Sequence, residues 1–162
     1  MANPPAPVDD ATFKLAMSHF TSGVTVVTTE HDGTRFGLTV ASFASVSLNP
    51  PLVLVCIGTE AKSHHAIAAS GKFGVSILSR EQAELSGRFA SRVDDKFAGV
   101  KVIVGELGEP LIDGAICALS CRVHSQLPGG DHSIFVGEVV GVKTAEGVPL
   151  VYYRSAYRDL ST

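Results

Sequence analysis

The sequence lacks tryptophan, is poor in charge and has no long apolar run. Charged residues make up 18% of its 162 residues and aromatic residues 7%, where the usual charged share is about 25%. The net charge is −3 and no basic run occurs, which argues against a nucleic-acid-binding protein because phosphate binding needs a basic face. The longest apolar stretch, residues 52–57, is far shorter than the ~20 residues of a membrane-spanning helix.

Cysteine is also scarce, and no CxxC motif is present. The chain has three cysteines, Cys56, Cys117 and Cys121. On one strand the Cα atoms of the last two would lie ~13 Å apart, whereas a disulfide needs less than about 7 Å. We therefore expect reduced, partly buried thiols in a cytoplasmic protein. The N-terminus lacks the charged and apolar regions of a signal peptide, and residues 1–9 are expected to form a flexible, proline-rich tail.

Apolar residues, by contrast, are plentiful. They make up 45% of the chain, which argues against disorder because disordered chains are charge-rich and apolar-poor. The length fits a single domain, residues 10–162, which is large enough to bury a full core without disulfides. The low charge also indicates that something besides the chain's own core covers part of the apolar surface. A partner subunit or a bound cofactor would do so.

The residue pattern predicts a mainly β protein. A first helix is expected over residues 10–23, capped by Asp10 and ended by Gly23, and an Asp-Gly turn over residues 31–34. Two short inserted helices follow, one over residues 63–70 closed by Gly71 and one opened by the capping box at residues 79–82. The strand candidates are residues 24–30, 36–48, 52–57, 73–78, 100–107, 115–126, 133–143 and 150–155. Of these, residues 52–57 form a continuous apolar run that should be buried on both faces. Long antiparallel runs of this kind are typical of a Greek-key-like β-barrel.

Several motifs of well-known enzymes are absent. No GxGxxG follows a strand, which speaks against a Rossmann dinucleotide site, and no GxSxG is present for a serine hydrolase. The six histidines form neither HExxH nor a zinc pattern with cysteine. We therefore expect no metal site, and a small esterase-like hydrolase is disfavoured.

Lys62 and Ser63 stand where a helix is expected to begin. The segment of residues 58–63 resembles a P-loop but lacks the glycine directly before the lysine. Free backbone N–H groups, the positive end of the helix dipole, a lysine and a hydroxyl would together hold one phosphate. The alternative is an ordinary serine cap beside a surface lysine.

Residues 39–47 combine hydroxyl groups with small side chains. Thr39, Ser42, Ser45 and Ser47 lie on one extended segment. Small residues there would let a flat ligand approach the backbone, whose N–H and C=O groups can recognise its polar edge. The alternative is a plain strand in which serine and threonine alternate outward.

Two further positions are candidates for cofactor contacts. His132 follows a Gly-Gly turn and Asp131, where an imidazole could orient a cofactor or assist a proton transfer near neutral pH. A solvated turn histidine is the alternative. Arg88, which precedes Phe89 near the end of the second inserted helix, could bind phosphate, or it could simply favour the negative end of its helix.

In these segments the sequence resembles the flavin reductase family of the flavin-binding split β-barrel, whose members are the reductase partners of two-component flavin monooxygenases. The shared motifs run in family order from about residue 11 to residue 158. They are Phe20-x-x-Gly23-Val24-x-Val26-Val27-Thr28, Gly37-Leu38-Thr39-Val40-Ala41-Ser42-Phe43-x-Ser45-Val46-Ser47-x-x-Pro50-Pro51, Lys62-Ser63-His64, Phe73-x-Val75-x-Ile77-Leu78, Arg88-Phe89-Ala90, and Gly130-Asp131-His132 with Ile134-Phe135-Val136-Gly137-Glu138-Val139.

The resemblance implies an antiparallel split β-barrel and an NAD(P)H:flavin oxidoreductase that supplies reduced flavin to a separate monooxygenase. It implies FMN or FAD and NADH or NADPH as cofactors, and a homodimer with the flavin site at its interface. Two other functions stay open: an electron-transfer protein with tightly bound flavin, and a non-catalytic flavin-binding protein.

The resemblance also assigns roles to residues. Contacts to the isoalloxazine and ribityl chain fall to Thr39, Val40, Ala41 and Ser42, flanked by Ser45, Val46, Ser47, Cys56 and Ile57. The phosphate would be held by Lys62, Ser63, Arg88 and Phe89. His132 would contact the nicotinamide cofactor.

Overall fold

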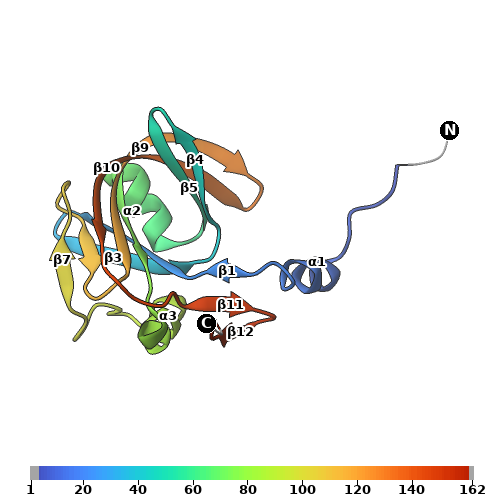
Figure 1. Ribbon diagram of the computed structural model, residues 1–162. Coiled ribbons are helices and arrows are strands. Elements are labelled where there is room, and N and C mark those ends of the chain that lie inside the picture. The colour runs from blue at the N-terminus through green and yellow to red at the C-terminus, as the bar shows by residue number, and fades with distance from the viewer. Residues whose placement is uncertain (1–3, 161–162) are drawn as a thin grey trace.

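The computed structural model describes residues 4–160, which form a curved antiparallel sheet with short helices on both of its sides (Figure 1). The helices are α1 (Asp10–Met17), α2 (Lys62–Ser70) and α3 (Ala83–Ala90), and a 3-10 turn, η1 (Arg80–Gln82), precedes α3. The strands are β1 (Ser22–Gly23), β2 (Thr25–His31), β3 (Thr34–Val40), β4 (Phe43–Leu48), β5 (Pro51–Gly58), β6 (Lys72–Ile77), β7 (Val102–Val104), β8 (Pro110–Ile112), β9 (Cys117–Gly129), β10 (His132–Thr144), β11 (Val151–Tyr153) and β12 (Ala156–Arg158). The predicted mainly β, antiparallel class is confirmed.

Seven strands form the main sheet in the order β3-β2-β6-β9-β10-β5-β4. Every neighbouring pair is antiparallel. The hairpin of β2 and β3 turns through Asp32 and Gly33, which both have positive φ, as the Asp-Gly signal predicts. The two long strands β9 and β10 form the hairpin that ends at Gly130 and Asp131. This hairpin end therefore carries His132 to the end of β5.

The core consists of two apolar clusters, one on each side of the sheet. Helix α2 lies on the concave side, where Ile67 packs with Val27, Ile57, Phe73 and Phe135. The outer cluster lies under α3 and contains Val26, Leu78, Phe89, Ile112 and Leu150. Because α2 fills the inside of the curved sheet, its first turn is fixed beside the ends of β5 and β10.

Strand β5 is buried on one face only, which corrects the expectation for residues 52–57. Val53, Val55 and Ile57 are buried, while the intervening Leu52, Leu54 and Cys56 are half-buried. The alternation arises because one face of β5 packs on the core of α2 and the other is covered only in part within this chain. An apolar run alone does not distinguish these two cases.

The N-terminal helix is shorter than expected and stands away from the sheet. α1 ends at Met17, not near Gly23, and its N-cap is Asp9, whose carboxylate accepts from the Thr12 N–H at 2.9 Å. Asp10 therefore lies in the first turn and is not the cap. None of the residues of α1 is buried, and Figure 1 shows the helix projecting beyond the body of the chain.

Other boundaries also differ from the sequence expectation. Residues 36–48 form two strands, β3 and β4, because the chain leaves the sheet at residues 41–42. Residues 100–107 contribute only β7, whose partner β8 lies in a segment where no strand was expected. Residues 150–155 contain only β11, which lies between β1 and β12 in a small three-stranded sheet. The helix end at Gly71, with positive φ, and the capping box of Ser79 and Gln82 are confirmed.

Cys117 and Cys121 share β9, and all three cysteines are free thiols, of which only Cys121 is fully buried. No helix within residues 4–160 is long and apolar enough to cross a membrane. The single domain of residues 10–162 and the flexible tail of residues 1–9 stay predictions, and residues 1–3 and 161–162 lie outside the described part.

Candidate functional site

The turn before β10 holds His132 in a fixed, accessible position. Its Nδ1 lies 2.7 Å from Oδ1 of Asp131, and about half of its side chain is exposed. The hydrogen bond from His132, and then its charge, lower the pKa of the Asp131 carboxyl below its usual value. A carboxylate at Nδ1 keeps a proton on that nitrogen, which leaves Nε2 for another partner. Nε2 faces Gly58, where an added Cβ would lie 3.9 Å away.

The first turn of α2 begins beside this histidine. Its N-cap is Ala61, which makes no side-chain cap hydrogen bond. The His64 N–H donates to the Ala61 carbonyl at 2.9 Å, which leaves the N–H groups of Lys62 and Ser63 without an acceptor inside the helix. Lys62 is exposed and Ser63 is buried, and both line a cavity of about 540 Å³. This is the arrangement expected for a phosphate: a cation, a hydroxyl and the positive end of a helix dipole.

The cavity at Lys62 contains charged residues that the sequence reading missed. Arg35, Arg92 and Lys96 line it together with the acidic Glu60, Asp94 and Asp95. Lys96 donates to the Phe89 carbonyl at 2.8 Å and to the Gly37 carbonyl at 3.3 Å, and burial lowers its pKa. No local motif marked these residues, because the loop of residues 91–97 is placed by contacts with distant strands.

Residues 41–46 form a strip that is exposed except at Phe43 and carries mostly small side chains. Ala41, Ser42, Ala44 and Ser45 are exposed, while Ser47 is half-buried. The Ser42 hydroxyl contacts β5, donating to the Cys56 carbonyl oxygen at 3.1 Å. Through this contact Cys56 lies beside the strip, and its side chain is half-buried. A flat ligand could approach the backbone here.

The neighbouring candidates Thr39, Val40 and Ile57 have inward roles. The Thr39 hydroxyl donates to the Ser86 carbonyl in α3 at 2.6 Å, so it is engaged within the chain. Val40 is buried, and Ile57 has no exposed surface. Val46, by contrast, is 49% exposed. The segment therefore divides into a packed part that supports the sheet and an exposed part that can contact a ligand.

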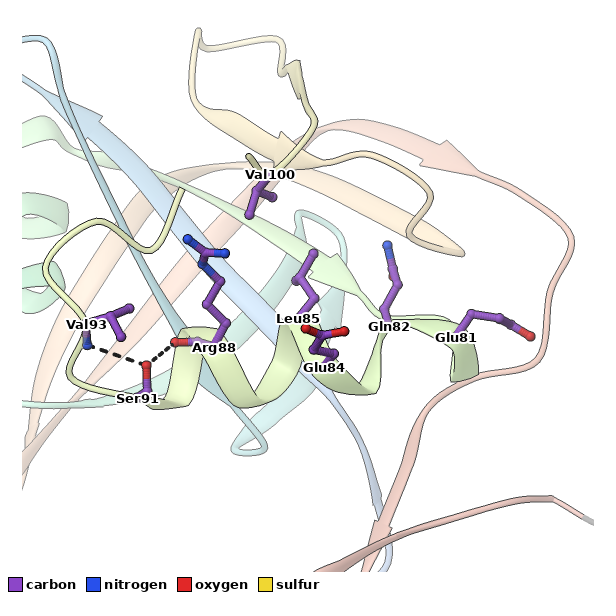
Figure 2. Close-up of a pocket in the computed structure, with 8 residues that line it drawn as sticks. All are labelled: Glu81, Gln82, Glu84, Leu85, Arg88, Ser91, Val93 and Val100. Atoms are coloured by element: carbon purple, nitrogen blue, oxygen red, sulfur yellow. Dashed lines mark hydrogen bonds between the residues drawn. The ribbon is translucent and has the colours of Figure 1, made fainter. Parts of the chain in front are cut away.

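Arg88 and Phe89 lie apart from the Lys62 cavity. Arg88 lines a separate cavity of about 710 Å³ with residues of α3, Val93 and Val100 (Figure 2). Its Nη2 donates to the Asp95 carbonyl at 3.2 Å. Phe89 is fully buried, and its ring packs edge-on against Phe97 at 5.0 Å. The structure therefore places both residues so that they hold the loop of residues 91–97, which walls the Lys62 cavity.

Gly37 shows how closely this loop region packs. A Cβ at Gly37 would lie 2.5 Å from the Phe89 ring, which leaves no room for a side chain. Gly37 belongs to the motif shared with the family, so the sequence marked this position but not its contact with Phe89. Phe89 thus supports the wall of the cavity through β3, and it has no surface open to the cavity itself.

The site residues therefore gather into two groups at one end of the sheet. His132, Gly58 and the start of α2 are joined through Thr59, whose N–H donates to the Asp131 carbonyl at 3.0 Å. The strip of residues 41–46 lies along the neighbouring β5, with Phe43 paired to Val55. Arg88 and Ala41 line other cavities, Arg88 the one beside α3 and Ala41 one formed with Phe13, Met17 and Phe20.

Comparison with known proteins decides the family. The family model described as "Flavin reductase like domain" matches residues 17–161. The chain belongs to this family. The resemblance read from the sequence is thereby confirmed, together with flavin reduction as its class of activity.

Relatives of the flavin reductase family extend the match over nearly the whole chain. The reductase subunit HsaB of a flavin-dependent monooxygenase from Mycobacterium tuberculosis is 41% identical over 158 residues, covering 96% of this chain and 84% of the relative. The solved flavin reductase PheA2 is 43% identical, with a TM-score of 0.87 and coverage of 96% and 100%. The Streptomyces globisporus NADH:FAD oxidoreductase SgcE6, solved with NAD and FAD fragments, is 36% identical with a TM-score of 0.92, covering 99% of this chain and 98% of that one.

Proposed function

We propose that this flavin reductase transfers a hydride from NADH or NADPH to FMN or FAD and supplies the reduced flavin to a separate monooxygenase. The observation that carries the proposal is the juxtaposition of the uncapped α2 start, with Lys62 and Ser63 at a cavity, and the exposed His132 turn. The names of the relatives support the same reading, since one is a monooxygenase reductase subunit and another an NADH:FAD oxidoreductase.

The α2 start fits a flavin phosphate. The free N–H groups of the first turn, the Lys62 ammonium and the Ser63 hydroxyl supply donors and positive charge at one place. Arg88 would act on this site indirectly, through the Asp95 carbonyl that its guanidinium holds in the wall of the Lys62 cavity. Phe89 supports the same wall from below Gly37.

The exposed strip of residues 41–46 fits the ring and ribityl chain. Small side chains there leave the backbone open to a planar ligand, and Ser42, Ser45 and Cys56 offer polar or polarisable groups around it. Ser47 flanks the strip, while Val40, Ile57 and the bonded Thr39 give it a rigid base. The chain thus holds the ring by shape and backbone contacts.

His132 fits the nicotinamide end of the site. Asp131 fixes its ring orientation through the 2.7 Å contact at Nδ1, and Nε2 is left for a ligand. When both cofactors are bound, the flavin accepts a hydride from the reduced nicotinamide, which is chemistry that the cofactors themselves supply. The residues of this chain position the two partners, which removes the entropic cost of an encounter in solution.

A homodimer would complete this site. Within one chain the strip of residues 41–46 is open, and the apolar residues Phe13, Met17 and Phe20 at the projecting helix α1 are more than half exposed. A second copy that covers these surfaces would enclose the flavin, and it would account for the low charge of the sequence. Light scattering should give twice the 16.9 kDa of the chain, and a monomer would contradict the dimer.

The experiment that tests the function is an oxidation assay of the purified chain with NADH or NADPH. Oxidation should require added FMN or FAD, because the flavin accepts the hydride and leaves. Oxidation that proceeds at the same rate without any flavin would overturn the proposal. A yellow colour that survives extensive dialysis would instead favour the tightly bound flavoprotein.

A further inference from the structure

A polar cluster of two buried residues and one exposed residue joins helix α2 to the hairpin of β9 and β10. It consists of His64, Ser133 and Gln126, which we call the His64 cluster. His64 Nε2 lies 2.8 Å from the Ser133 hydroxyl oxygen. The Gln126 amide nitrogen donates to the same hydroxyl at 3.1 Å and lies 3.3 Å from His64 Nε2. Three separate elements therefore meet at one hydrogen-bonded point.

The His64 cluster links two segments of the proposed site. His64 comes two residues after Lys62, on the first turn of α2, and Ser133 directly follows His132. One hydrogen bond thus connects the helix turn of the proposed phosphate site to the strand start that carries the proposed nicotinamide contact. Neither His64 nor Ser133 lines the Lys62 cavity.

The surroundings of His64 are apolar and fix its ring. The side chain is only 8% exposed, and it packs edge-on against Phe135 at 5.2 Å. Nδ1 is buried and has no hydrogen-bond partner among residues 4–160. Burial, with a smaller contribution from His65, lowers the pKa of His64, so the ring is neutral near pH 7 and acts as a hydrogen-bonding group.

A second contact ties the same two parts of the chain. Thr59, in the segment between β5 and α2, donates to the Asp131 carbonyl from its N–H at 3.0 Å and from its hydroxyl at 3.2 Å. The turn of Asp131 and His132 is therefore held on two sides, at the surface by Thr59 and in the core by His64. Removing the inner contact would leave the turn held by Thr59 and by the backbone pairing of β10 with β5 and β9.

We propose that His64 is a positioning residue: through Ser133 it sets the His132 turn against the start of α2, and it thereby couples nicotinamide binding to the flavin site. The inference rests on the proposed function, because it needs His132 to contact the nicotinamide. His64 would contact neither cofactor; it would set the relative position of the two cofactor sites.

The proposal predicts a specific pattern in the variants. In His64→Leu and Ser133→Ala the KM for NADH should rise about 2- to 10-fold, the usual worth of one hydrogen bond. The kcat at saturating NADH should stay close to that of the parent, since the bound geometry is the same once NADH occupies the site. The double variant should lose no more than either single one, because both remove the same bond.

Two further variants keep the test independent of folding. Gln126→Ala changes an exposed residue of the cluster, and it should raise the KM for NADH in the same direction while the protein stays folded. Ser120→Ala is the matched control, because Ser120 is a buried serine of the same sheet that accepts from the Glu106 N–H at 2.9 Å, far along β9 from the hairpin end. It should lower the melting temperature without changing the KM.

The decisive experiment is steady-state kinetics of these variants with NADH and FMN, with His132→Ala as reference. A KM that is unchanged in Ser133→Ala and Gln126→Ala, or single effects that simply add in the double variant, would overturn the role of His64. Failure of the proposed function looks different: the parent would not oxidise NADH in a flavin-dependent way, or His132→Ala would leave the KM for NADH unchanged.

Discussion

The Ser42 hydroxyl donates to the Cys56 carbonyl oxygen across 3.1 Å, which fixes the exposed strip of residues 41–46 beside β5. It joins the strip to the Cys56 main chain, and the Cys56 thiol, which is half-buried, belongs to the residue that flanks the surface we assign to the flavin ring. The thiol therefore reports on occupancy of that surface. Its reactivity gives a measure of flavin binding that does not depend on turnover.

Saturating FMN should slow alkylation of Cys56 several-fold, because the bound ring covers the strip and the thiol beside it. Cys117, at the far end of β9, is the internal control and should react at the same rate with and without FMN. Cys121 should not react in the folded chain, because burial and then the nearby Glu109 raise its pKa to about 12. Peptide mass spectrometry after timed alkylation separates the three thiols. An unchanged Cys56 rate would place the flavin elsewhere.

Lys62→Ala should weaken FMN binding about 10-fold, the lower end expected for loss of a hydrogen bond to a charged group. Riboflavin, which carries no phosphate, should bind nearly as well as before. Fluorescence titrations of both flavins give the two dissociation constants. Lys101→Ala, which removes an exposed lysine outside the cavity, is the control. Equal losses for FMN and riboflavin would remove the phosphate role of Lys62.

His132→Ala should raise the KM for NADH roughly 3- to 10-fold, since the side chain lost is one hydrogen-bonding partner of the nicotinamide. The dissociation constant for FMN should change much less. His124→Ala provides a matched control, because His124 is an exposed histidine on the neighbouring strand β9. If the KM for NADH is the same in the His132 and His124 variants, the nicotinamide assignment is wrong.

The free energy of unfolding should fall as the pH drops below about 6.5, the ordinary pKa of histidine. The pKa of His64 is lowered in the folded chain, chiefly by burial. The unfolded chain therefore binds a proton at this residue at a higher pH than the folded chain, and acid favours unfolding. Urea unfolding between pH 5 and pH 8 measures the slope.

In His64→Gln the free energy of unfolding should fall less steeply as the pH drops. Near pH 8 it should differ from that of the parent by an offset that does not depend on pH. His124→Gln is the control for the loss of an exposed histidine, and the slope of the His64 variant is compared with it. Equal slopes in the parent and the His64 variant would show that His64 titrates alike in the folded and unfolded chains, which contradicts the burial argument.

Most local signals in the sequence predicted local structure, although the helix cap at Asp10 and the helix stop at Gly23 were wrong. The Asp32-Gly33 turn, the helix stop at Gly71 and the capping box at Ser79 all depend on neighbours within four residues, and all three are confirmed. The start of α2, where Lys62 and Ser63 stand, belongs to the same class. Such features follow from backbone conformation and capping, which a short segment determines for itself.

The features that the sequence did not reveal are those that depend on distant contacts. Arg88 was expected beside the same phosphate as Lys62, but the loop of residues 91–97 separates their cavities, and that loop is held by carbonyl groups of Gly37 and Phe89. The role of His64 likewise depends on Ser133, which is 69 residues away in the chain. Spacing within one element carries no information on such pairs.

The most direct test of the central claim is an anaerobic reaction of the chain with NADH and excess FMN, followed at the absorbance bands of both cofactors. We expect loss of NADH and bleaching of oxidised flavin in equal amounts, with the reduced flavin passing an ultrafilter that retains the protein. That result requires hydride transfer and release of the product. Loss of NADH without flavin bleaching, or reduced flavin that stays wholly with the protein, would contradict a reductase that supplies flavin to a separate enzyme.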